Sequence, residues 1–192
     1  LLQQPPFPAG YTLARLVVLN AGVTVVLIGV SEGWRTSVIV GAAIIAAVLA
    51  VHLGTLLRAV HRGRTRRFAA SLRYYWAAGT AVLVGIGFGV TLAVGQLSQE
   101  WFGRIYAAHV HLGLFGWVTL AVLGTQFSLW PTALRTRMVP GTERAARWSL
   151  AGCAGGLVIV VAGLLSWNRA VAVSGVAVYL GGVVVFAVPF VR

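Results

Sequence analysis

Residues Tyr74 to Gln96 read YYWAAGTAVLVGIGFGVTLAVGQ and contain no charged side chain. A helix needs roughly 20 apolar residues to cross the ~30 Å hydrocarbon core of a bilayer, so this stretch is long enough to span a membrane. Five other stretches are also predominantly apolar and long enough to span a membrane. The six windows cover about residues 12–30, 36–59, 74–96, 104–130, 148–166 and 170–191. The sequence therefore predicts an all-α, polytopic membrane helical bundle of about six transmembrane helices, with residues 1–192 as a single transmembrane domain.

The composition of the whole chain supports a membrane protein. Hydrophobic residues make up 59% of the chain and charged residues 9%, and the mean hydropathy is +0.89. These values lie far from those of soluble globular domains. The formal charge of +12 would suggest a nucleic-acid partner in a soluble protein, but here the basic residues fall in short segments between apolar stretches. We therefore expect membrane lipid as a partner and no nucleic acid.

The arginines predict the orientation of the helices, because cytoplasmic loops of membrane proteins carry an excess of positive charge. All fifteen basic residues are arginine. Twelve of them lie at the ends and in the two loops that we expect on the inner side: Arg15, Arg58, Arg62, Arg64, Arg66, Arg67, Arg73, Arg135, Arg137, Arg144, Arg147 and Arg192. The other three are Arg35, Arg104 and Arg169. The predicted location is the cell membrane, multi-pass, with both ends of this segment cytoplasmic.

The single cysteine and the start of the chain limit other hypotheses. Cys153 lies inside an apolar window, so the chain offers no disulfide framework and no thiolate metal cluster. The chain begins Leu1-Leu2 without a methionine or a basic signal region. One expectation is that it is a fragment of a longer protein. We also see no internal repeat in the sequence.

The histidines inside the predicted spans are the candidates for chemistry, because an ionisable side chain within a bilayer is costly. His109 and His111 lie near the outer end of the fourth window, beside the aromatic residues Trp101 and Tyr106 that we expect at the membrane interface. Residues two apart on a helix point about 200° from each other, so these two rings cannot share one iron. Either they serve two sites or only one is a ligand. The alternative is that each merely bonds to a neighbouring helix or to interfacial water.

The other two histidines do not complete a site with this pair. His52 lies near the cytoplasmic end of the second window and is a third candidate for cofactor binding. The rise of 1.5 Å per residue places it more than about 10 Å from His111 along the membrane normal. A second axial ligand to a haem at His109 or His111 would then come from outside this sequence or from a weaker donor. We interpret His61 as a solvated loop residue, with an anionic lipid headgroup as the alternative partner.

Two glycine pairs predict places where helices approach closely. Gly85 and Gly89 in the third window, and Gly152 and Gly156 in the fifth, are spaced four residues apart and share a helix face. The alternative is chance, because the chain contains 24 glycines. Glycine-rich helices also leave room beside a flat ligand such as a porphyrin.

Several motifs resemble known families. The sequence Ala108-His109-Val110-His111 is similar to the His-x-His of a late subunit I helix in haem-copper oxidases, where each histidine faces a different haem. A closer resemblance covers most of the chain and rests on three stretches. They are RFAASLRYY at 67–75, HVHLGLFGWV at 109–118 and LWPTALRTRM at 129–138.

These stretches resemble the membrane region that precedes the cupredoxin domains in actinobacterial multicopper oxidases of the copper nitrite reductase type. The chain departs from that family in two ways. No cupredoxin domain follows Arg192, so we expect copper not to be bound by this segment, and the further histidine-bearing helices with which family members begin are not in the sequence. The resemblance implies that such helices would supply the second haem ligand.

The sequence leads to one main functional hypothesis and two rivals. The main hypothesis is a membrane electron-transfer module of an oxidoreductase in the respiratory chain. In it, His109 and His111 ligate haem b, and electrons pass from quinol to an extracytoplasmic cupredoxin domain or other respiratory subunit, with an oligomer expected. The first rival is a cofactor-free membrane anchor or assembly subunit. The second is a small transporter with His52 and His109 as proton relays, which predicts broken helices or repeat symmetry.

Overall fold

The structure, a computed structural model, describes residues 9–61, 69–133 and 141–191, and the regular structure in these ranges is entirely helical. The elements are α1 (Ala9–Ser31), α2 (Arg35–His61), α3 (Ala69–Val94), α4 (Gln99–His111), the π-helical segment η2 (Leu112–Val118), α5 (Thr119–Ala133), α6 (Thr142–Leu165) and α7 (Arg169–Val191). The segments α4, η2 and α5 follow one another directly and form one span. Six helices of the described part are long and apolar enough to cross a membrane, which confirms the predicted all-α bundle.

Several helices extend beyond the predicted windows. α3, α4 and α6 begin five or six residues earlier than predicted, at Ala69, Gln99 and Thr142, and α5 continues to Ala133, past the proline at position 131 that would end a helix in water. The windows stop where charged or polar side chains begin. The extension of α3 contains Arg73 and that of α6 contains Arg144 and Arg147, and a helix tolerates these residues at the interface because their long side chains can extend towards water.

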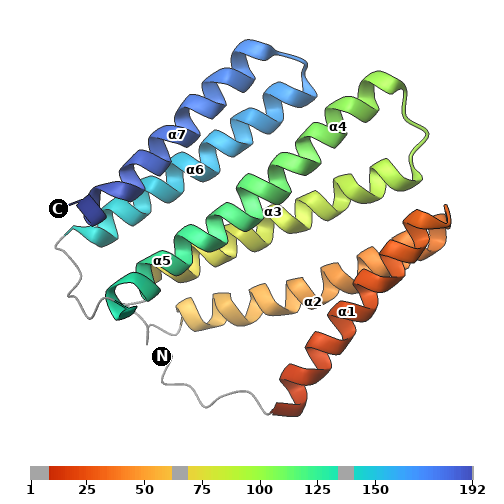
Figure 1. The fold of residues 1–192 in the computed structure, drawn as a ribbon, viewed down its shortest axis with the longest axis horizontal. Coiled ribbons are helices and arrows are strands. Elements are labelled where there is room, and N and C mark those ends of the chain that lie inside the picture. Colours follow the sequence, from red (N-terminus) through yellow and green to blue (C-terminus); the bar gives the residue numbers. More distant parts are fainter. Residues whose placement is uncertain (1–8, 62–68, 134–140, 192) are drawn as a thin grey trace.

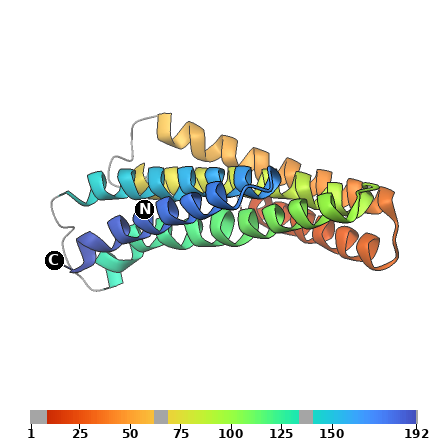
Figure 2. The same ribbon diagram turned by 90° about the horizontal axis from the view of Figure 1, so that it is seen from above.

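The spans lie roughly along one direction, with α2 and α4 on opposite sides of α3 (Figures 1 and 2). α6 and α7 lie side by side, and α1 lies at the edge of the bundle against α2 (Figure 1). The core forms where α3, the fourth span and α6 meet, around the fully buried side chains of Tyr74, Leu120 and Cys153. The hydroxyl of Tyr74 donates a hydrogen bond to Ser149 Oγ (2.8 Å), which ties α3 to α6 inside this core.

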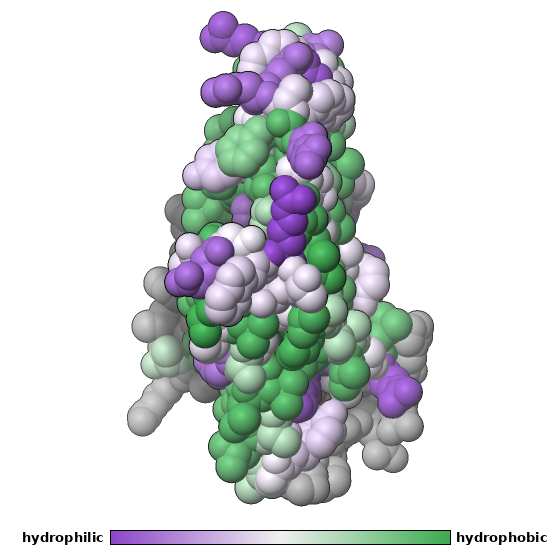
Figure 3. All heavy atoms as spheres, turned by 90° about the vertical axis from the view of Figure 1, so that its right-hand side faces the viewer, coloured by the Kyte–Doolittle hydropathy of each residue, from purple (hydrophilic) through white to green (hydrophobic). Residues whose placement is uncertain are grey.

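The two ends of the bundle differ in charge. At one end, which we call the turn end, lie the connections α1–α2, α3–α4 and α6–α7 (Figure 1). Seen from this end, hydrophilic residues form separate patches among apolar ones (Figure 3). The opposite, arginine-rich end carries the described residues Arg58, Arg73, Arg144 and Arg147. The arginines that the sequence analysis placed in the loops at 62–68 and 134–140, and Arg192, lie outside the described residues.

Close glycine contacts hold two helical hairpins together, α1–α2 and α6–α7. A Cβ atom added at Gly152 would lie 2.8 Å from Gly182 Cα, and one added at Gly156 would lie 2.5 Å from the backbone nitrogen of Tyr179. The expected close approach at this pair is therefore confirmed. Both hairpins use the same register, with glycines separated by seven and then twelve residues: Gly22, Gly29 and Gly41 in the first, and Gly156, Gly163 and Gly175 in the second.

Candidate functional site

The imidazole of His109 lies against α3. Its Nδ1 is 2.8 Å from the carbonyl oxygen of Gly85, and a Cβ atom added at Gly89 would lie 3.0 Å from His109 Cε1. Of the two glycines that the sequence analysis paired, Gly89 makes room for the imidazole, whereas a Cβ atom at Gly85 would only be in ordinary contact with Leu112 at 3.6 Å. A side chain at Gly89 would push the ring away, which is a physical reason for glycine at this position.

His111 faces a different neighbour. Its Nδ1 is 2.8 Å from the carbonyl oxygen of Ala107, one turn earlier on the same helix. Its ring packs on Phe115 with 5.5 Å between ring centroids, and Phe115 in turn meets Tyr179 of α7 edge to face at 5.6 Å. The two half-buried histidines therefore point to different sides of the fourth span, one towards α3 and the other towards the Phe115–Tyr179 pair.

Both histidines have an arrangement that is compatible with metal binding. When Nδ1 carries the proton and donates it to a carbonyl oxygen, Nε2 keeps its lone pair for a ligand. Ligating histidines typically hold their second nitrogen in this way, which fixes the tautomer and the ring orientation. His109 lies ten residues after the start of α4, about 15 Å along the helix, and about 8 Å beyond Arg104. Each imidazole thus keeps one nitrogen that could serve as an axial ligand, and because the two rings face opposite sides of the helix they could not ligate the same iron.

The π-helical segment η2 begins directly after His111. In η2 the backbone hydrogen bonds close wider rings than in an α-helix, and such segments occur frequently at functional sites. Thr119 Oγ1 donates to the carbonyl oxygen of Leu114 (2.9 Å), and the Tyr179 hydroxyl donates to that of Phe115 (2.9 Å). These contacts give carbonyl groups of η2 side-chain partners, and the backbone N–H of Thr119 also donates to Leu114 O.

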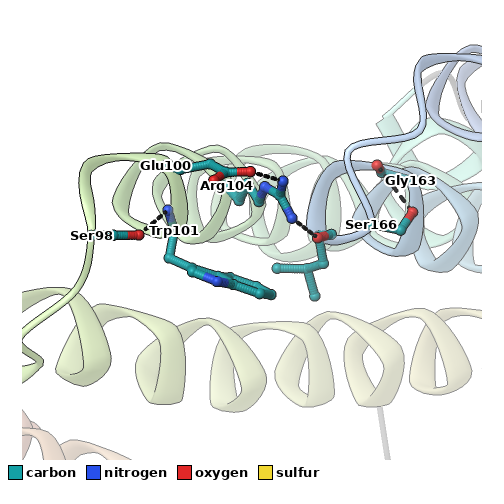
Figure 4. Close-up of polar contacts among 7 residues, drawn as sticks. Ser98, Glu100, Trp101, Arg104, Gly163 and Ser166 are labelled. Atoms are coloured by element: carbon teal, nitrogen blue, oxygen red, sulfur yellow. Dashed lines mark hydrogen bonds and ion pairs between the residues drawn. The ribbon is translucent and has the colours of Figure 1, made fainter.

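A cationic cluster lies between the histidines and the turn end. The Arg104 guanidinium is 5.0 Å from the ring centroid of Trp101 and 5.3 Å from that of Trp167, so it lies between two indoles. It also forms an ion pair with Glu100 and donates to the carbonyl oxygen of Leu165 at the end of α6 (3.2 Å) (Figure 4). The cluster thus joins α4 to the α6–α7 hairpin.

Trp167 takes part in this cluster at the cost of backbone strain. Its φ of 55° is left-handed, a conformation that costs a non-glycine residue about 1–2 kcal/mol. It follows the end of α6, where Asn168 N–H donates to Gly163 O (2.8 Å) and Trp167 N–H to Leu164 O (3.3 Å). These two hydrogen bonds form a Schellman motif at the end of a helix, in which the left-handed residue, here Trp167, is usually glycine. The equivalent residue of the α1–α2 turn is Gly33, with φ 69°.

The remaining histidines do not join the site. His52 is exposed on α2, and its neighbour Leu53 packs against the position of Gly79 on α3. Gly79 is six residues from Gly85, or about 9 Å along α3, so His52 lies nearer the arginine-rich end than His109 does. His61 is the last residue of α2, and its side chain lies outside the described residues. Within the described ranges, no group of three or more histidine, cysteine or acidic residues could hold a metal ion.

No family model, curated protein or solved structure matches the chain. The evidence on function is therefore the geometry of this span. Two of its features were missed by the sequence analysis. The sequence analysis considered Arg104 only as one of the three arginines outside the inner set, although Trp101 lies three residues earlier and therefore on the same side of a helix. Tyr179 was not singled out, and its contact with η2 has no signal in the local sequence.

Proposed function

We propose that this chain is a membrane electron-transfer module that binds haem b through His109 and His111. It relays electrons from quinol to an extracytoplasmic partner, either a cupredoxin domain of the nitrite reductase type or an oxidase. The proposal rests on the resemblance of the His-x-His motif and on one structural observation. Each imidazole has its Nδ1 at hydrogen-bond distance from a backbone carbonyl, which leaves Nε2 for a ligand on opposite sides of a span.

The chain's own residues have distinct roles in this proposal. Gly85 and Ala107 orient the two imidazoles through their carbonyl oxygens, and Gly89 leaves room for the His109 ring. Phe115 packs on the His111 ring and is held in place by its edge-to-face contact with Tyr179. A bound haem would supply a one-electron redox centre whose potential depends on its axial ligands and burial. A second axial ligand would be supplied by a group outside residues 1–192.

The orientation of the bundle is part of the proposal. The positive-inside rule assigns the arginine-rich end to the cytoplasm and the turn end, with His109 nearer to it, to the outer face. A cysteine introduced at exposed Gln96 should react with an impermeant maleimide in whole cells, whereas one introduced at exposed Glu143, in the first turn of α6, should react only after lysis. Native Cys153 is fully buried and gives a low background. The reverse labelling pattern would refute this orientation.

The decisive experiment is a reduced-minus-oxidised absorption spectrum of the protein purified with its native partners, together with a pyridine haemochrome assay. We expect a b-type signal that is lost or shifted in His109→Ala and His111→Ala. His52→Ala tests the third candidate and should leave the signal intact, because His52 is exposed on another helix. Absence of haem from the intact complex would refute the proposal.

A second pair of variants tests the position of the His109 ring rather than its chemistry. Gly89→Ala would place a methyl group 3.0 Å from the imidazole, whereas Gly87→Ala meets nothing within 4 Å. If His109 is a haem ligand, Gly89→Ala should shift the absorption maximum or the midpoint potential while Gly87→Ala does not. Identical spectra for the two variants would argue against ligation by His109.

The rival function is a cofactor-free anchor or assembly subunit. It is favoured by the observation that the bond from His109 to Gly85 also crosses between α4 and α3, as expected of a histidine that only packs helices together. This function predicts that His109→Gln leaves the partner's quinol-driven turnover nearly unchanged. Electron transfer through this site predicts loss of that turnover, and the spectrum separates a lost cofactor from a misfolded complex.

A further inference from the structure

A groove opens between α2, α3 and α6 at the arginine-rich end of the bundle. Its cavity has a volume of about 470 Å³. Arg73 of α3 and Arg147 of α6 line it together with apolar side chains, among them Leu72 and Leu150. Both arginines are exposed. The groove therefore has two cationic groups beside an apolar channel.

This cavity continues into a second one of about 340 Å³ further towards the turn end. The two share Trp76, Ala77 and Ala154 in their walls. Along α3 the lining extends from residue 72 to 84, which is about 18 Å at 1.5 Å per residue. One leaflet of hydrocarbon is about 15 Å thick, half of the ~30 Å core. The combined groove thus has the length of the acyl chains of one leaflet.

Within the described residues, no acidic side chain forms an ion pair with the two arginines of the groove. The one ion pair found there joins Arg104 to Glu100 at the other end of the bundle. Glu143 lies one turn before Arg147 on α6, but the two are not within salt-bridge distance. Two uncompensated guanidinium groups at the mouth of an apolar groove are complementary to an anionic headgroup with acyl chains.

We propose that this groove binds an anionic phospholipid, with its phosphate at Arg73 and Arg147 and an acyl chain along Trp76 and Ala154. Basic pockets between transmembrane helices on the cytoplasmic side are typical sites for such headgroups. A neutral quinol or a zwitterionic lipid would leave the net positive charge of the pair uncompensated. The lipid joins α6 to α2 and α3, where the protein's own contacts leave a gap. This site is independent of the proposed haem, because it depends on neither histidine.

The test is the thermal stability of the purified protein in detergent on titration with phosphatidylglycerol or phosphatidylcholine, with native mass spectrometry to count bound lipid. We expect saturable stabilisation and a bound adduct with phosphatidylglycerol only. Removing one arginine should weaken the affinity about fivefold, and removing both about 25-fold. The variants are Arg73→Gln and Arg147→Gln. Arg144→Gln is the matched control, because Arg144 is exposed one turn earlier on α6 and does not line the groove.

A second variant tests the channel rather than its charges. Ala154→Leu fills the point where the two cavities meet and leaves both arginines in place, so it should reduce binding of long-chain lipid more than that of a short-chain analogue with the same headgroup. An equal reduction by Ala154→Leu in the binding of the long-chain and the short-chain lipid would overturn the proposal. So would an equal loss in Arg144→Gln and Arg147→Gln, or a partner protein cross-linked within the groove of the native complex.

Discussion

Gly156 lies at one of the close contacts between α6 and α7, and its replacement by alanine is a direct test of the packing of this hairpin. A Cβ atom at this position would be 2.5 Å from the backbone nitrogen of Tyr179, and 2.8 Å from both Tyr179 Cα and Gly175 O. All three are backbone atoms and cannot rotate away. α7 must therefore shift by about 1 Å to reach ordinary van der Waals distance.

The expected loss of stability follows from that shift. A gap of about 0.5–1 Å removes a quarter to a half of the dispersion energy of the atoms it separates, and overpacking of this kind costs about 1–3 kcal/mol. Replacing glycine by alanine in a helix interior contributes about 0.5–1 kcal/mol in the opposite direction. We expect Gly156→Ala to lower the free energy of unfolding by about 1–2 kcal/mol.

The neighbouring glycine provides the control. A Cβ atom at Gly155 would meet nothing within 4 Å, so Gly155→Ala gains the helix preference without the clash. The assay is reversible unfolding in mixed micelles of increasing dodecyl sulfate content, followed by circular dichroism. Gly155→Ala should be as stable as the wild type or slightly more so. Equal stability of Gly155→Ala and Gly156→Ala would refute the packing of α6 on α7 described above.

Three further substitutions test the core and the cationic cluster, each measured by the same unfolding assay. Tyr74→Phe removes the buried hydrogen bond to Ser149 and should cost about 1 kcal/mol; no change would mean that this bond does not hold α3 to α6. Arg104→Lys keeps the charge but loses the planar group that lies between two indoles, and should cost about 1 kcal/mol, with Arg104→Gln costing more. Trp167→Gly relieves the left-handed strain that Trp167→Ala retains, so the glycine variant should be the more stable by about 1 kcal/mol; the opposite order would contradict the φ of 55°.

The sequence predicted the spans well because membrane insertion depends on a local property. Each span is a stretch of about 20 apolar residues, and hydropathy adds up along a window without reference to the other helices. The ends were less well predicted. α6 begins at Thr142 rather than Trp148, because the first turn carries arginines that hydropathy excludes but that a helix at the interface tolerates.

The site was predicted in part. The sequence indicated His109 and His111 as the candidates and placed their rings on different sides of a helix, since the angle per residue is fixed by helix geometry. It did not indicate that His109 packs on Gly89, or that His111 precedes a π-helical segment. The glycine pair at 85 and 89 was interpreted as a site of close helix approach, and the contact between Gly89 and the His109 imidazole was missed.

By itself, the sequence determined that this chain is a helical membrane bundle, which stretches are long and apolar enough to span, and between which of them the arginines gather. Only the tertiary structure decided the neighbours of each polar group: a carbonyl of α3 for His109, two indoles for Arg104 and a carbonyl of η2 for Tyr179. The physical reason is the range of the interactions. Burial in lipid is set by the composition of one helix, whereas a hydrogen bond or ring contact requires two helices to meet at one register, which the composition of either helix alone does not fix.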